Sequence, residues 1–226
     1  MTKRPHSLSP RALAIAGWTA FVLAGGIFFT LAWNVATHAP LVVLDAKVAA
    51  WLHNHGTRAL TQAMLVVTQV HSTLGVTLWS LVFAAVLYRQ RQVLWILTLA
   101  LAVGGGMALN VLLKHAYERA RPHFDDPLIT LSSYSFPSGH AAGATLFYGV
   151  LAAFLVSRIV DRRLRAACVA GAVIAVLLVS LSRMYLGAHY LSDVLAAACS
   201  STAWLALCLS SVHGLAMRRT ASAPAT

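Results

Sequence analysis

Charged side chains are scarce in this sequence, since only 10% of its 226 residues are Asp, Glu, Lys or Arg. A soluble domain carries roughly 25% charged residues, so the scarcity argues against a soluble fold. Hydrophobic residues make up 59% of the chain, and the mean hydropathy is +0.73. The length accommodates six apolar helices of about 20 residues each, joined by short loops. We therefore expect one integral membrane domain and no separate soluble domain.

Cysteine is also rare. The three cysteines, Cys168, Cys199 and Cys208, all fall within apolar runs and are interpreted as small core or lipid-facing residues. This placement argues against a disulfide framework and against a cysteine metal site. Acidic residues number only six, and the formal net charge is +11. Because the cations form short tracts between apolar runs, they indicate loop topology and not a nucleic-acid partner.

The apolar runs predict an all-α fold, an integral membrane six-transmembrane-helix bundle. The expected spans are residues 12–33, 66–88, 92–113, 139–156, 166–182 and 188–209. The first is interpreted as a span because its apolar run exceeds that of a normal signal peptide. Three consecutive glycines, Gly104 to Gly106, allow close backbone approach or a local kink in the third span.

Residues 41–56 are too short and too charged to cross a membrane. Leu44, Val48, Trp51 and Leu52 follow helical spacing, and Asp45 and Lys47 lie off that stripe. The pattern predicts a short interfacial amphipathic helix with Trp51 at headgroup depth.

Six spans place both termini on one side of the membrane. Of the 17 Lys and Arg residues, eleven lie on the terminal side and six on the other. The positive-inside rule then makes both termini cytoplasmic, in a bacterial inner membrane with the loops 34–60, 114–138 and 183–188 facing the periplasm. The expected boundaries are a cytoplasmic tail over 1–11, the membrane domain over 12–212 and a disordered cytoplasmic tail over 213–226.

The first polar cluster begins with Lys114 and ends with Arg121 and Pro122. Lys114 and Arg121 are seven residues apart, so a continuing helix would place both on one face. Two fixed cations there could hold two oxygens of one phosphate. The alternative is a pair of cations that extend to the membrane interface.

The second cluster is Tyr134-Ser135-Phe136-Pro137-Ser138-Gly139-His140. Pro137 suits the first turn of a helix, whose free N–H groups would point at an anion. Gly139 permits close backbone approach, and the Ser138 hydroxyl adds a donor. His140 could protonate a leaving oxygen. A simple helix cap is the alternative.

The third cluster contains Arg183, His189 and Asp193. In a helix His189 and Asp193 would be one turn apart on one face, where the carboxylate fixes the imidazole tautomer. Arg183 adds a planar cation suited to phosphate oxygens. A His–Asp pair is common by chance, but the three clusters together make a phosphate site with a nucleophile and an acid.

Taken in order, the motifs Lys114-x6-Arg121-Pro122, Pro137-Ser138-Gly139-His140 and Ser182-Arg183-x5-His189-x3-Asp193 resemble the signature of the type 2 phosphatidic acid phosphatase (PAP2) family. Vanadium haloperoxidases share this signature, but they are soluble and larger, so the membrane spans favour the phosphatase branch. One departure is Ala196-Ala197, where the family often has a glycine.

The resemblance implies that His189 attacks phosphorus and forms a phosphohistidine, that Asp193 orients it, and that His140 protonates the leaving group and then activates water. It also implies that the phosphoryl oxygens are held by Lys114, Arg121, Ser138, Gly139 and Arg183. No metal and no cofactor are expected, because these groups already supply a positive field.

The expected enzyme is therefore a phosphoric monoester or diphosphate hydrolase that acts on a membrane lipid phosphate. Undecaprenyl pyrophosphate is the first choice, and phosphatidylglycerol phosphate, phosphatidic acid and lipid A 1-phosphate are also compatible. The alternatives are a lipid-to-lipid phosphotransferase, a non-enzymatic lipid carrier or transporter, and a metallohydrolase that uses the two histidines and Asp193 as ligands.

Several polar residues receive no catalytic role. His71 is interpreted as a polar contact between packed helices. Four residues of the first outer loop are interpreted as solvated: His115, His123, Asp125 and Asp126. Arg119 is either an additional phosphate contact or a cation extending to the interface.

Overall fold

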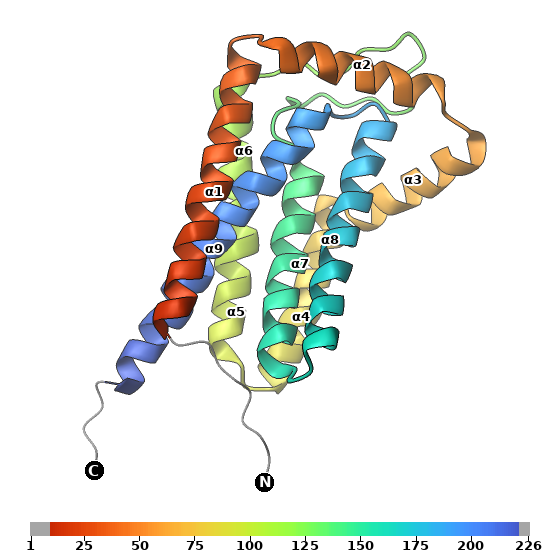
Figure 1. The fold of residues 1–226 in the computed structure, drawn as a ribbon. Coiled ribbons are helices and arrows are strands. Elements are labelled where there is room, and N and C mark those ends of the chain that lie inside the picture. The colour runs from red at the N-terminus through yellow and green to blue at the C-terminus, as the bar shows by residue number, and fades with distance from the viewer. Residues whose placement is uncertain (1–9, 222–226) are drawn as a thin grey trace.

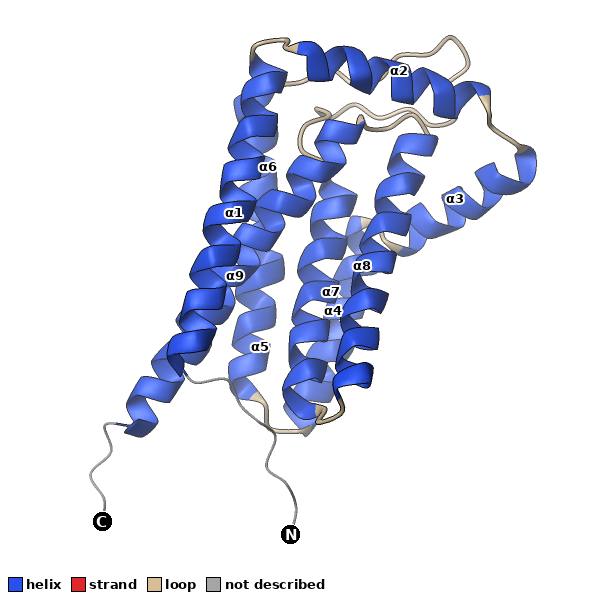
Figure 2. Cartoon of the chain, in the orientation of Figure 1, coloured by secondary structure: helices blue, strands red, loops and turns tan. Residues whose placement is uncertain are grey.

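The computed structural model describes residues 10–221, and every regular element in that range is helical (Figures 1 and 2). The elements are α1 (Pro10–Ala36), α2 (Pro40–Asn54), α3 (Arg58–Val70), α4 (Thr73–Arg89), α5 (Val93–Leu99), the π-helix η1 (Ala100–Gly105), α6 (Gly106–Tyr117), α7 (Gly139–Arg158), α8 (Arg162–Tyr185) and α9 (Leu191–Ala221).

The membrane bundle expected from hydropathy is confirmed. Five stretches are long and apolar enough to cross a membrane, and α3 with α4 makes a sixth if this bent pair is one span. Figure 1 shows α1 lying along α9, and α7 among α4, α8 and α9. The core between α4, α7 and α9 is filled by apolar side chains, of which Leu87, Leu146 and Val150 are fully buried.

The second span differs from the prediction because it is broken at His71 and Ser72. Helices α3 and α4 meet there at an angle of 52°. The Ser72 hydroxyl accepts a hydrogen bond from the Gly75 N–H at 3.2 Å and so begins α4. A side chain at position 75 would collide with the Val70 carbonyl oxygen, so glycine permits the close turn.

The glycines of the third span permit the predicted close backbone approach, and the helix there has an irregularity of another kind than the kink weighed for it. The backbone widens into the π-helix η1, which includes Gly104 and Gly105. Gly105 and Gly106 also permit close packing. An added Cβ would lie 2.7 Å from the Trp204 ring at position 105 and 2.5 Å from the Leu146 side chain at position 106.

Helix α2 lies across the outer end of the bundle, as predicted for residues 41–56 (Figure 1). Leu44 and Trp51 are 47% and 59% exposed, which is consistent with a lipid-facing stripe. Asp45 is a surprise, because it is fully buried and points towards α9. Because Asp45 lies off the apolar stripe of α2, it was expected to face water, but it faces the protein instead.

Two helix ends also differ from the predictions. Helix α6 ends at Tyr117, and Glu118 follows with a left-handed φ of 43°, so no continuous helix joins Lys114 to Arg121. Helix α9 continues to Ala221, well beyond 209, so the tail expected to be disordered from 213 is helical through Ala221. The remaining tail calls, 1–9 and 222–226, lie outside the described residues.

Candidate active site

The three sequence clusters meet at the end of the bundle that is covered by α2. Asp193 lies in the first turn of α9, Arg183 in the last turn of α8, and Ser138 caps the N-terminus of α7. The loop 118–138 connects α6 to α7 and contributes Arg121. Figure 2 shows this loop passing close to α2 and the outer ends of α8 and α9.

His189 and Asp193 form the predicted pair, but His189 precedes α9, which begins at Leu191, and does not lie one helical turn from Asp193 as predicted. The Nδ1 atom of His189 lies 3.5 Å from Oδ2 of Asp193, and the two side chains are 2% and 0% exposed. Gly187 has a left-handed φ of 68°, which turns the chain between α8 and α9. Burial lowers the pKa of His189 to about 4, although Asp193 opposes the shift. At neutral pH the imidazole is therefore uncharged and nucleophilic.

Arg121 lies on the other side of the imidazole. Its Nη1 atom is 3.3 Å from Nε2 of His189 and donates to the Ala188 carbonyl at 2.6 Å. Its Nε donates to the Ser133 carbonyl at 2.6 Å. Burial lowers the pKa of Arg121, and Asp193 opposes this. The loop backbone thus holds the guanidinium where Nε2 would meet a phosphoryl group.

Lys114 reaches the same loop without a continuing helix. Its Nζ donates to the Tyr134 carbonyl at 2.5 Å and lies 3.5 Å from the Ser135 carbonyl. The structure therefore brings Lys114 and Arg121 to one loop by folding the chain back after Tyr117, which differs from the predicted helical face.

The start of α7 has the predicted form. Ser138 is fully buried, and its hydroxyl accepts from the Ala141 N–H at 3.5 Å, which leaves the hydroxyl proton unused in that contact. Its N–H donates to the Asp193 carbonyl at 3.1 Å and joins α7 to α9. Gly139 follows as the first helical residue, and the side-chain oxygen of Asn110 would lie 3.5 Å from an added Cβ.

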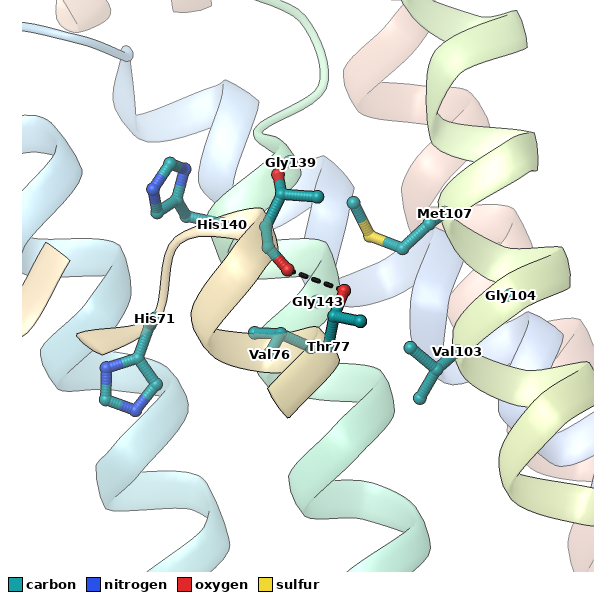
Figure 3. A pocket seen from close by; sticks show the side chains of 10 residues that line it. His71, Val76, Thr77, Val103, Gly104, Met107, Gly139, His140 and Gly143 are labelled. Carbon is teal, nitrogen blue, oxygen red and sulfur yellow. Dashed lines mark hydrogen bonds between the residues drawn. The ribbon is translucent and has the colours of Figure 1, made fainter. Parts of the chain in front are cut away.

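His140 lines a cavity of about 150 Å³ bounded by α4, η1, α6 and α7. Figure 3 shows His140 and His71 on one side of this cavity and Met107 and Val103 on the other. Within residues 10–221 His140 has no hydrogen-bond partner, so both ring nitrogens are available to another molecule.

Arg183 is 3% exposed and has an unused donor. One terminal nitrogen donates to the Thr68 hydroxyl of α3. The Nε atom is buried and has no partner among the described residues. A buried N–H without an acceptor costs free energy, which a bound anion would recover.

Three residues at the site, Ser135, Ser192 and Asp45, were given no role there by the sequence, and a fourth, Arg119, was given a different one. The Ser135 hydroxyl donates to Oδ2 of Asp193 at 2.5 Å and lies 3.5 Å from Nδ1 of His189. Arg119 binds Asp193 and Asp45, and Ser192 binds Asp45. Ser135 could have been found from its position inside the Tyr134–His140 motif. Asp45 offered no such signal, because it lies 148 residues before Asp193.

Arg119 takes neither of the roles weighed for it. Its Nη1 donates to Asp193 at 2.6 Å and its Nη2 to Asp45 at 2.8 Å, while its guanidinium lies 4.3 Å above the Tyr190 ring. Burial acts to lower the pKa of Arg119, but the Asp193 and Asp45 carboxylates outweigh burial and raise it. Its hydrogen-bonding capacity is directed to protein carboxylates.

His71 has the packing role that the sequence favoured. Its Nδ1 lies 2.8 Å from the Val67 carbonyl and its Nε2 lies 2.7 Å from the Tyr148 hydroxyl, which ties the α3–α4 break to α7. The cavity lining is an additional role.

Asp126, one of the loop residues interpreted as solvated, has a partner in α2. Asp126 pairs with His53 of α2 at 2.8 Å, and the hydrogen bond from His53 lowers the pKa of Asp126. His53 also stacks on Phe124. The Asp126 side chain is 87% exposed, as expected for a solvated residue, but it is also paired with α2. Across residues 10–221, no group of three or more His, Cys, Asp or Glu side chains is arranged to hold a metal ion.

The chain matches known proteins in sequence and in structure. The family model of the PAP2 superfamily matches residues 93–216. Phosphatidylglycerophosphatase B of Bacillus subtilis (strain 168) is 44% identical over 101 residues, which is 44% of this chain and 49% of that protein. The match thus spans about half the length of this curated relative.

Two crystal structures share the fold. The first transmembrane PAP2 type phosphatidylglycerolphosphate phosphatase from Bacillus subtilis superposes with a TM-score of 0.78 at 28% identity, over 88% of this chain and 96% of that one. LpxE of Aquifex aeolicus superposes with a TM-score of 0.60 at 22% identity, over 74% and 94% of the two chains, and supports the fold alone. By its family match and its motifs, the chain belongs to the PAP2 superfamily.

Proposed function

We propose that this protein is a lipid phosphate phosphatase that works through a phosphohistidine and needs no metal. The observation that carries the proposal is the position of the His189 ring. Its Nδ1 faces the Asp193 carboxylate at 3.5 Å, and its Nε2 faces the Arg121 guanidinium at 3.3 Å. A neutral imidazole held between an anion and a phosphate-binding cation is arranged to attack phosphorus.

In the proposed first step, Nε2 of His189 forms a bond to phosphorus and the bond from phosphorus to the leaving oxygen breaks. His140 donates a proton to that oxygen. The imidazole becomes cationic as it attacks, and Asp193 stabilises this charge. In the second step His140 takes a proton from water, the water oxygen bonds to phosphorus, and inorganic phosphate leaves His189.

The phosphoryl oxygens would be held by Lys114, Arg121, Arg183, the Ser138 hydroxyl and the Gly139 N–H. The unpartnered Nε of Arg183 and the free hydroxyl proton of Ser138 support this assignment. Their positive field stabilises charge on the transferring group, which is the task a metal performs in other phosphatases.

The proposed substrate is a lipid phosphate at the outer leaflet of a bacterial inner membrane. The names of both Bacillus subtilis relatives refer to phosphatidylglycerol phosphate, which supports testing this lipid first. Undecaprenyl pyrophosphate, phosphatidic acid and lipid A 1-phosphate have the same terminal phosphate chemistry and remain candidates. We further propose cytoplasmic termini and a catalytic membrane domain over residues 12–212.

The test is phosphate release by purified protein in detergent, with EDTA present and each lipid offered separately. His189→Ala serves as the matched inactive variant. Release by the wild type and none by the variant supports the proposal and ranks the lipids. Loss of release in EDTA, restored by a divalent cation, overturns the metal-independent step. Equal release by the variant overturns the phosphohistidine. If neither protein releases phosphate, transport of a lipid becomes the better assignment.

A further inference from the structure

Asp193 is bound on both of its oxygens. Oδ2 accepts from the Ser135 hydroxyl at 2.5 Å and from the Tyr190 N–H at 2.9 Å, and it faces His189. Oδ1 accepts from Nη1 of Arg119 at 2.6 Å. Arg119 therefore fixes the oxygen that His189 does not use, and with it the plane of the carboxylate.

Arg119 is itself fixed from three sides. Its other terminal nitrogen donates to Oδ2 of Asp45 at 2.8 Å, and Nη1 also donates to the Ser192 hydroxyl at 2.7 Å. The Tyr190 ring covers one face of its guanidinium. These contacts leave the Arg119 side chain 9% exposed, so it is held away from any bound lipid.

Asp45 anchors this arrangement from α2. Its Oδ1 accepts from the Ser192 N–H at 2.9 Å, and its Oδ2 accepts from the Ser192 hydroxyl at 2.5 Å. Helix α2 is thereby joined to the first turn of α9, which carries Asp193. The Arg119 side chain thus links α2, through Asp45, to Asp193 of α9.

Charge balance gives Asp45 a second role. Arg119 lies between two carboxylates, so the three groups together carry one negative charge. If Asp45 were neutral, Arg119 would cancel the charge of Asp193, and the imidazolium formed on His189 would lose its counter-charge. With Asp45 present, Asp193 retains a net negative charge towards His189.

We propose that Arg119 and Asp45 are positioning residues for the Asp193–His189 pair, and that they do not bind the substrate phosphate. This inference rests on the proposed function. It separates Arg119 from Arg121, two residues later, whose guanidinium faces the nucleophile itself.

The test compares Arg119→Gln, Asp45→Asn and the double variant with the wild type in the phosphate-release assay. Lys47→Gln is the matched control, because Lys47 is exposed on the same helix. Each single variant should lower kcat about 10- to 100-fold, as expected for a misplaced catalytic group, with KM within about 3-fold. The double variant should lose less than the product of the two single losses, because removing both partners removes the charge imbalance.

A rise in KM at unchanged kcat would overturn the inference and make Arg119 a phosphate ligand. Multiplicative losses in the double variant would also overturn it. If Arg119→Gln does not elute from size exclusion as the wild type does, Arg119→Lys and Asp45→Asn carry the test. Arg119→Lys should recover part of the kcat lost in Arg119→Gln. A folded Arg119→Lys variant with the kcat of the wild type would contradict the inference.

The outcomes separate this inference from the proposed function. An inactive wild type, or an active His189→Ala, overturns the proposed function and the inference with it. An inactive His189→Ala beside a fully active Arg119→Gln overturns the inference alone.

Discussion

The Nε2 atom of His189 lies 3.3 Å from Nη1 of Arg121, on the side of the ring opposite Asp193. Arg121 is placed there by the carbonyl oxygens of Ser133 and Ala188, so its position does not require a bound phosphate. This arrangement is pre-organised for an anion that approaches the guanidinium and the imidazole together.

Arg121→Gln should lower kcat/KM by about 100- to 1000-fold, because one fixed donor to the charged transition state is lost. Arg121→Lys should be nearly as damaging, since an ammonium group cannot reproduce the planar set of contacts. Steady-state phosphate release measures both variants. Arg58→Gln is the control, because Arg58 is an exposed cation at the start of α3. Near wild-type activity in Arg121→Gln would exclude Arg121 from the phosphate site.

Ser135→Ala should lower kcat by about 10- to 100-fold, the equivalent of the 1.5–3 kcal/mol of a hydrogen bond to a charged group. The substitution removes the 2.5 Å donor to Asp193 and frees that carboxylate to rotate. Ser157→Ala at the opposite end of α7 removes a hydroxyl that binds only a local carbonyl and should be silent. Equal activity of the two variants would show that Ser135 does not support Asp193.

The pH profile should have its acidic limb near pH 4. Burial lowers the pKa of His189 to about 4, so protonation removes the nucleophile only when the pH falls to that value. An ordinary histidine would lose activity near pH 6.5. The alkaline limb should follow loss of the proton that His140 donates, which makes kcat/KM bell-shaped. The measurement is kcat/KM against pH in detergent. A flat profile with chemistry limiting the rate would contradict this division of roles.

Gly106→Ala should destabilise the bundle by about 1–3 kcal/mol through overpacking. The added Cβ would lie 2.5 Å from the side chain of Leu146, which is fully buried, and 3.0 Å from the Trp204 ring. Gly104→Ala is the matched control, because nothing lies within 4 Å of its added Cβ. Thermal unfolding in detergent compares the two. A melting temperature for Gly106→Ala equal to that of Gly104→Ala would contradict the packing argument.

Hydropathy predicted five spans closely, because a long apolar run without charge has few alternatives to a membrane helix. The remaining one, the second span, was misjudged near its start. His71 and Ser72 follow the polar residues Thr68 and Gln69, and the cap made by Ser72 and the close turn at Gly75 produce the break there. Such local hydrogen bonds compete with a continuous helix and leave no mark on average hydropathy.

The site was predictable where residue spacing is short and unpredictable where contacts are distant. His189 and Asp193 are four residues apart and were correctly predicted to pair, although α9 begins only at Leu191 and the two residues do not share a helical turn. Asp45 reaches Ser192 across 147 residues, and its carboxylate in an amphipathic pattern suggests exposure to water. Lys114 and Arg121 were brought together for a reason other than the predicted one, because the chain turns at Glu118.

Within residues 10–221, Lys114 and Arg121 rest on backbone carbonyls and make no ion pair, whereas Arg119 lies between two carboxylates. Neutral acceptors orient a cation without cancelling its field. The proposed phosphate site is therefore electropositive and should draw an anionic headgroup from the surrounding lipids before any contact forms. Dissolved salt screens such a field over about 8–10 Å. Ionic strength should consequently govern how readily the lipid is captured and leave bond cleavage in the buried site nearly unaffected.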